Sequence, residues 1–145
     1  MSIRIRPLEL QDVEALARIE QESFSMPWSA QDFADLLTRE YCTYYVAEDA
    51  GEPVACVGYT NLCGEANIDN VVVAPSHRRR GIAGELLQKL IRDAESAGVE
   101  AFTLEVRVSN ASAIHLYEKL GFVAEGVRPR FYERPTEDAL IMWKR

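Results

Sequence analysis

The sequence predicts one mixed α/β domain, residues 1–145, built on a mostly antiparallel sheet of about seven strands. Three observations lead to this prediction. About half of the 145 residues are hydrophobic, which is enough for one independent core. A β-branched run at 68–73 reads as a buried strand and is followed by a helical pattern. Short apolar runs bounded by turn residues recur on both sides of this unit.

The first part of the chain predicts one strand and two helices. Residues 3–6 alternate as a short strand, and residues 12–24 repeat apolar side chains at helical spacing. Ser29 and Asp32 form a possible capping box for a second helix that includes Leu37.

An antiparallel meander is predicted next. Residues 43–48 and 53–62 read as strands joined by the turn-rich segment 49–52, and a third strand ends at Val73. Cys56 lies in an apolar strand, where a small core residue is expected and a catalytic thiol is the alternative.

A helix follows the basic turn Arg78–Gly84. Its apolar residues recur at three- and four-residue steps, and Gly98 is placed to end it. The first N–H groups of a helix bind anions, and glycine lets a ligand approach the backbone. The alternative is a plain strand-to-helix turn with solvated arginines. Neither a P-loop nor a dinucleotide fingerprint is present.

The last part predicts a strand at 102–106, a helix starting at Asn110, and two strands at 122–125 and 139–143 joined by a loop. Glu105 is unusual inside an apolar strand because burying an unpaired charge is costly. It is either an outward-facing residue paired with a base or a functional carboxylate. Asn110 suits a helix cap, and Tyr117 could be a core residue.

Composition excludes several classes of protein. No apolar run approaches the roughly 20 residues of a membrane span, and the N-terminus lacks the layout of a signal peptide, so a cytoplasmic location is expected. Three cysteines without a C-x-x-C pair indicate neither a disulfide framework nor a zinc site. With two isolated histidines, no metal is expected.

Charge is distributed unevenly. Residues 7–65 hold twelve acidic and two basic residues, a balance of −10, whereas residues 66–145 hold eleven acidic and twelve basic residues, a balance of +1. This predicts an anionic cofactor in the second half and a cationic substrate near the first. The alternative for the acidic half is a solubilising surface. A net charge of −7 argues against nucleic-acid binding.

Four segments resemble the GCN5-related N-acetyltransferases (GNAT). The pattern R-x-x-G-x-A at 78–83 is similar to their acetyl-coenzyme A pyrophosphate loop. The string L-E-V-R-V-S-N-A-S-A-I-H-L-Y-E-K-L-G-F at 104–122, with P-W-S at 27–29 and E-D-A-L-I-M at 137–142, resembles the RimI branch, the ribosomal-protein N-terminal alanine acetyltransferases.

The resemblance implies a GNAT fold, with helices on both faces of a twisted sheet and a splayed pair of strands holding acetyl-coenzyme A. It implies that Glu105 is the general base and Tyr117 the general acid that protonates the leaving thiolate. The cofactor-binding residues that it implies are Val71, Val72, Val73, Arg78, Arg79, Arg80, Gly81, Ile82, Ala83, Gly84 and Asn110.

For the substrate, the resemblance implies the N-terminal α-amine of a protein, with the N-terminal alanine of a small-subunit ribosomal protein expected. Trp28 and Tyr132 are then candidate peptide contacts, although Trp28 could instead be a hydrophobic staple. The chain departs from its relatives where they carry N-Y-Y-P, since Arg130 to Glu133 precede a shifted Pro135. A lysine or small cationic amine as acceptor, and a non-catalytic coenzyme A-binding module, remain as alternatives. A monomer is expected.

Overall fold

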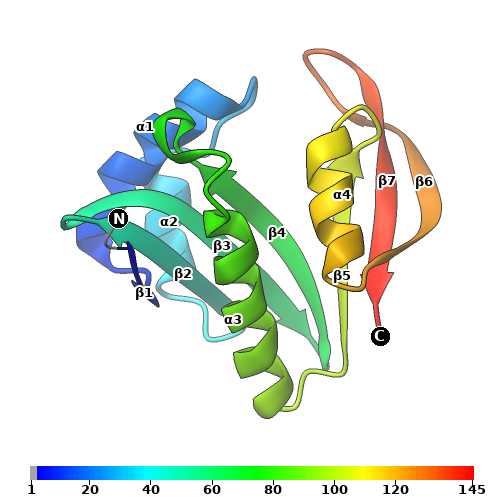
Figure 1. Cartoon of the computed structure of the whole chain (residues 1–145), viewed down its shortest axis with the longest axis horizontal. Coiled ribbons are helices and arrows are strands. Elements are labelled where there is room, and N and C mark those ends of the chain that lie inside the picture. The colour runs from blue at the N-terminus through cyan, green and yellow to red at the C-terminus, as the bar shows by residue number, and fades with distance from the viewer. Residues whose placement is uncertain (1–2) are drawn as a thin grey trace.

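The computed structural model describes residues 3–145, which form a single seven-stranded sheet with the order β1-β2-β3-β4-β5-β7-β6 (Figure 1). Neighbouring strands are antiparallel except β4 and β5, which are parallel. The strands are β1 Ile3–Pro7, β2 Cys42–Asp49, β3 Glu52–Leu62, β4 Glu65–Val73, β5 Ala101–Arg107, β6 Val123–Tyr132 and β7 Glu137–Lys144.

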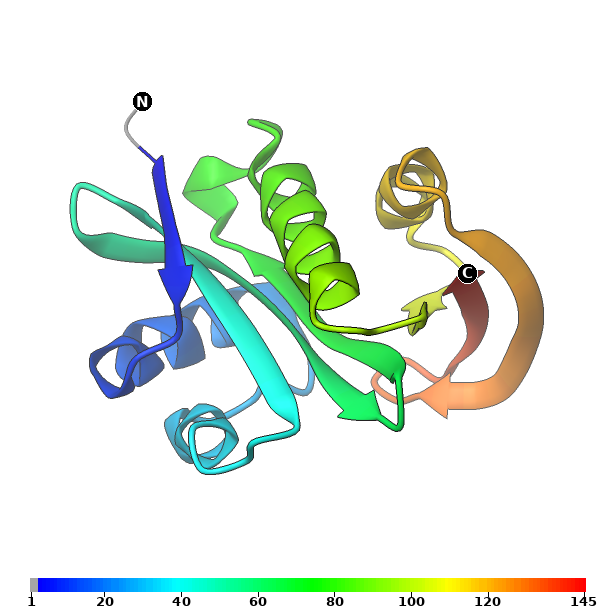
Figure 2. The same ribbon diagram turned by 90° about the horizontal axis from the view of Figure 1, so that it is seen from below.

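Helices cover both faces of the sheet, as expected. Helices α1 and α2 lie on one face, and α3 and α4 lie over the other (Figure 2). No helix among residues 3–145 is long and apolar enough to cross a membrane. The helices are η1 Leu10–Asp12, α1 Val13–Ser23, α2 Ala30–Leu36, η2 Pro75–His77, α3 Ile82–Ser96 and α4 Ala111–Lys119, where η marks a short 3₁₀ turn.

The apolar stripes predicted for the helices form the core. Leu16 of α1 and Phe33 of α2 are fully buried on one face of the sheet, and Leu86 and Leu90 of α3 are fully buried on the other. Ser29 caps α2 by accepting a hydrogen bond from the Asp32 N–H, and the Asp32 carboxylate accepts one from the Ser29 N–H, as the capping box predicts. Leu37, expected in this helix, lies just beyond its end and is exposed.

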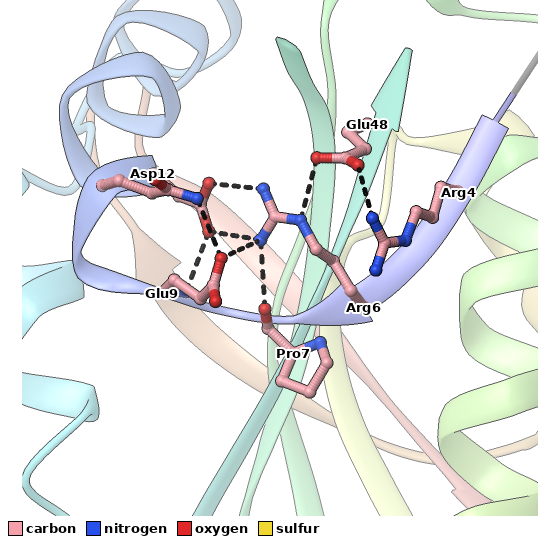
Figure 3. A network of polar contacts seen from close by, with 7 residues as sticks. Arg4, Arg6, Pro7, Glu9, Asp12 and Glu48 are labelled. Carbon is pink, nitrogen blue, oxygen red and sulfur yellow. Dashed lines mark hydrogen bonds and ion pairs between the residues drawn. The ribbon is translucent and has the colours of Figure 1, made fainter. Parts of the chain in front are cut away.

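A polar network fastens the first strand (Figure 3). Arg6 donates two hydrogen bonds, of 2.8 and 2.7 Å, to the two carboxylate oxygens of the buried Asp12, and a third of 2.8 Å to Glu48 on β2. Arg4 reaches the same Glu48 from an exposed position. The guanidinium fork of Arg6 therefore satisfies a carboxylate that would be costly to bury alone.

Strands β4 and β5 diverge, which confirms the splayed pair. They pair only where Glu65–Asn67 lie beside Ala101–Thr103, and beyond that point the two strands separate (Figure 1). Residues 71–73 still pair with β3, through Val57, Cys56 and Ala55. The backbone groups on the other side of these residues therefore face the gap between the two strands.

A β-bulge interrupts β4 beside this gap. Gly58 pairs with Asn70 and Tyr59 pairs with Ile68, so Asp69 is the extra residue. The Asp69 carboxylate accepts hydrogen bonds from the Tyr44 hydroxyl and, at 2.6 Å, from Thr60. Bulges often lie next to active sites, where they redirect side chains.

The end of the chain differs from the prediction. The loop expected at 126–138 is largely strand, because β6 continues to Tyr132 and only residues 133–136 form the turn. The register is irregular at two places: between Ala124 and Gly126, and between Arg128 and Tyr132, where Pro129 and Arg130 are accommodated and the φ of Arg130 is +53°. Almost all of β6 is exposed, so its sequence shows no alternation of apolar and polar residues, and Gly126 and Pro129 read as breakers.

Candidate active site

Two adjoining cavities follow the gap between β4 and β5. The loop cavity, about 670 Å³, lies at the turn before α3, and the inner cavity, about 400 Å³, lies between β4, β5 and the link from α1 to α2. Val71, Asn110 and Tyr117 line both cavities, together with Ser23 and Phe24. The two cavities therefore share part of their walls.

The loop cavity brings together most of the residues that the sequence assigned to the cofactor. Arg80 is on the same turn but is not among the residues that line the cavity. The cavity is lined by Val71, Val72, Val73, Arg78, Arg79, Gly81, Ile82, Ala83, Gly84 and Asn110 from that set.

The turn before α3 has the geometry of an anion site. Gly81 precedes the helix with a φ of +76°, and a Cβ added there would have no atom within 4 Å. The N-cap of α3 is Gly81, which has no side chain to cap the helix, so the first N–H groups of α3 suit an anionic ligand. Arg78 is oriented by hydrogen bonds to the Val73 carbonyl, at 3.1 Å, and to the Ser23 hydroxyl, at 2.9 Å.

Glu105, Tyr117 and Tyr132 line the inner cavity together. Glu105 is half-buried on β5, between the buried Leu104 and Val106. Burial raises the pKa of Tyr117 above its usual range, and the nearby Tyr132 adds to this effect. Burial, followed by the Glu105 carboxylate, raises the pKa of Tyr132 to about 12. Both phenols are therefore protonated at neutral pH.

Trp28 and Asn110 have roles of their own at the cavity walls. Trp28 lines the inner cavity while its ring packs 5.3 Å from that of Phe33 and 6.1 Å from that of Tyr44. It thus anchors the link between α1 and α2, as the staple alternative predicted, and still contacts the cavity. Asn110 caps α4 by accepting a hydrogen bond of 3.2 Å from the Ala113 N–H.

The sequence analysis missed several polar residues that line the inner cavity: Glu20, Asp69, Asn70 and Arg107, with Ser23 and Ser25. Glu20 lies in the apolar stripe of α1, four residues after Leu16, and its side chain is therefore buried, with 1% exposed. That position could have identified Glu20 from the sequence, because a carboxylate on the buried face of a helix needs specific partners.

Cys56 is fully buried, and burial raises the pKa of its thiol, which makes it an inert core residue.

A model of the acetyltransferase (GNAT) family matches residues 13–122. The chain belongs to this family. It is 38% identical over 142 residues to the ribosomal protein bS18-alanine N-acetyltransferase of Escherichia coli (strain K12), a match that spans 95% of this chain and 94% of that protein.

Solved structures of GNAT proteins have the same fold. The crystal structure of the ribosomal-protein-S18-alanine N-acetyltransferase from Escherichia coli aligns with a TM-score of 0.91 and 36% identity, over 99% of this chain and 93% of that one. The PaiA N-acetyltransferase from Thermoplasma acidophilum, in complex with coenzyme A, aligns with a TM-score of 0.82 over 100% and 99% of the two chains. At 19% identity, that likeness concerns the fold alone.

Proposed function

We propose that this GNAT protein transfers an acetyl group from acetyl-coenzyme A to the N-terminal α-amine of a protein, specifically an N-terminal alanine of a ribosomal protein such as bS18. The observation that carries the proposal is that a carboxylate, Glu105, and a protonated phenol, Tyr117, line the inner cavity, which adjoins the loop cavity. The relatives named for bS18-alanine acetylation match nearly the whole of this chain, which supports the acceptor. Such an acceptor places the reaction in the cytoplasm.

The residues present fit acetyl-coenzyme A. The uncapped N-terminus of α3 and the open space at Gly81 suit a pyrophosphate, and Arg78 and Arg79 add positive charge beside it. On the side away from β3, the backbone of the segment Val71 to Val73 has no β5 neighbour, so the groups that face the gap are available to pair with an extended, amide-bearing chain. When bound, the co-substrate supplies a thioester as the acetyl donor.

The inner cavity supplies the acid and base groups for direct transfer. Glu105, acting through water, accepts the proton of the attacking amine, and a backbone N–H of the diverging β4 segment, that of Val71, stabilises the oxyanion. Tyr117 lines both cavities and donates its proton to the departing thiolate. The phenol is protonated at neutral pH and so has a proton to donate.

A single carboxylate base suits an α-amine better than a lysine. An α-amine with a pKa near 8 needs about 1.4 kcal/mol to lose its proton at pH 7, whereas a lysine near 10.4 needs about 4.6 kcal/mol. Trp28 and Tyr132 line the inner cavity, from the link before α2 and from the end of β6. In this proposal they contact the acceptor peptide.

The test measures release of free coenzyme A from acetyl-coenzyme A with three acceptors. These are a hexapeptide that starts Ala-Arg with a free N-terminus, its N-blocked copy with an internal lysine, and spermidine. We expect turnover with the free N-terminus only. Turnover with the lysine peptide or spermidine would replace the proposed acceptor, and tight cofactor binding without any turnover would identify a non-catalytic module.

A further inference from the structure

The buried carboxylate of Glu20 joins two walls of the inner cavity. One oxygen, Oε1, accepts a hydrogen bond of 3.0 Å from the backbone N–H of Trp28. The other, Oε2, accepts one of 3.1 Å from the side-chain Nδ2 of Asn70. Both donors are neutral amides, one from the link between α1 and α2 and the other from β4.

These two partners hold functional parts of the inner cavity. Trp28 lines the cavity on the acceptor side, and its ring packs on Phe33 and Tyr44. Asn70 directly follows the bulged Asp69 and directly precedes Val71, where the two cavities meet. The wall of the inner cavity that contains Trp28 is called the acceptor wall. A change in the Glu20 contacts would therefore move the acceptor wall relative to the bulged strand β4.

We propose that Glu20 is a positioning residue for acetyl transfer, which fixes the bulged segment of β4 against the link that carries Trp28. This inference rests on the function proposed above. Glu20 does not touch the reacting atoms in this role. It sets the distance between the acceptor wall and the backbone N–H of Val71, and placing reacting groups within a fraction of an ångström is a large part of catalysis.

The chemistry of the pair explains why a carboxylate is used. A carboxylate offers two acceptors and no donor, so it accepts both amide protons at once. It also fixes the Asn70 amide, since the opposite orientation would direct an oxygen at Oε2. This orientation costs the amide oxygen its hydrogen bond, since the Asn70 Oδ1 is buried and has no hydrogen-bond partner among residues 3–145. Such an unpaired acceptor is expected only where another contact is more important.

The test interchanges the carboxylate of Glu20 and the amide of Asn70. Asn70→Asp places two carboxyl groups side by side and removes the hydrogen bond between residues 70 and 20. The double variant Glu20→Gln/Asn70→Asp restores that hydrogen bond with the amide and the carboxylate interchanged. Glu20→Gln alone is accommodated when the Asn70 amide turns, because its Oδ1 then accepts from the new amide. All variants are made in a Trp143→Phe background, which leaves Trp28 as the only tryptophan. Assays at pH 8 disfavour a proton shared by two carboxyl groups.

At saturating peptide, we expect kcat to fall at least about tenfold in Asn70→Asp and to return to within about threefold of the background enzyme in the double variant. Thermal unfolding measured alongside separates this from a structural role, which would lower the melting temperature and leave the kcat of the folded enzyme unchanged. The proposal is overturned if Asn70→Asp retains full kcat, or if the double variant is no better than Asn70→Asp.

Trp28 fluorescence gives a measurement that needs no acceptor. We expect the emission maximum to shift to longer wavelength in Asn70→Asp and to return in the double variant. If the background enzyme fails with every acceptor, the proposed function has failed, and the emission still decides whether Glu20 holds the two walls together. Unchanged emission in all variants would overturn the inference.

Discussion

The guanidinium carbon of Arg107 lies 4.6 Å from the centroid of the Tyr132 ring. The same guanidinium donates hydrogen bonds to the carbonyls of Glu133, at 2.9 Å, and Pro135, at 3.0 Å, and to the Glu137 carboxylate, at 3.1 Å. One side chain at the end of β5 therefore holds both the turn between β6 and β7 and the aromatic residue that lines the inner cavity. Of the segment that departs from the family pattern, Tyr132 lines the inner cavity, and Arg107 ties it to the turn at 133–136.

Arg107→Ala is expected to raise the KM for the acceptor peptide at least about tenfold, because Tyr132 and the turn lose their common support. The dissociation constant for acetyl-coenzyme A, whose loop lies at the other end of the site, should stay within about twofold. Steady-state kinetics and calorimetry measure the two quantities. Arg145→Ala is the matched control, since Arg145 also lies over an aromatic ring, 4.3 Å from that of Trp143, but outside both cavities. Equal effects of the two variants would contradict the assignment.

Tyr117→Phe is expected to bind acetyl-coenzyme A normally and to lower kcat by about 100-fold, because only the proton donor is removed. The ring, which packs 5.9 Å from that of Phe122, keeps its position. Coenzyme A release and equilibrium binding check the two halves of this prediction. Tyr41→Phe, at an exposed tyrosine outside the cavities, is the control. Undiminished turnover in Tyr117→Phe would remove this phenol from the mechanism.

Gly81→Ala is expected to weaken acetyl-coenzyme A binding about tenfold, because the new Cβ projects into the anion site and the turn is strained. Gly51→Ala separates these two causes. Gly51 also has a positive φ, +85°, and also has no atom within 4 Å of an added Cβ, but it lies in the hairpin between β2 and β3. Each variant should lose about 1 to 2 kcal/mol of stability, and only Gly81→Ala should lose affinity. A similar loss of affinity in both would point to a general effect of strain.

Arg6→Ala is expected to lower the free energy of unfolding by about 3 to 5 kcal/mol, because it leaves the buried Asp12 carboxylate without its cation. Arg4→Ala, whose side chain is 75% exposed and reaches Glu48, should cost at most about 1 kcal/mol. Urea unfolding of both variants measures the difference. Comparable losses would mean that the bonds to Asp12 contribute little.

Much of the sheet could be predicted because it leaves local patterns, whereas most of the candidate site residues were predicted from the resemblance to GNAT proteins. The meander and the stripe of α3 are periodic, and the capping box at Ser29 is a short local motif. The part of the loop cavity from Arg78 to Gly84 lies in one contiguous turn, but Val71 to Val73 and Asn110 come from other elements. Strand β6 left no pattern, because it is exposed on both sides and contains Gly126 and Pro129. The Glu20 contact could not be predicted, since Asn70 is 50 residues away and its orientation depends on a bulge that no periodicity reveals.

Stability should depend on pH through Glu20. Burial raises the pKa of its carboxyl above the usual 4.5, against the opposing effect of hydrogen bonds from Trp28 and Asn70. The folded protein therefore holds this proton more tightly than the unfolded chain does. The resulting stabilisation is complete below pH 4.5 and is lost as the pH rises through the folded pKa. In the Glu20→Gln variant the side chain cannot ionise, so the stability of this variant relative to the wild type should increase as the pH rises from about 4 to 8.

Urea unfolding across that pH range tests this prediction, with Glu22→Gln, at an exposed position of the same helix, as the control for removing one negative charge. A wild type that gains stability relative to Glu20→Gln with rising pH would show that the two hydrogen bonds outweigh burial, and that the carboxylate is the preferred form in the fold.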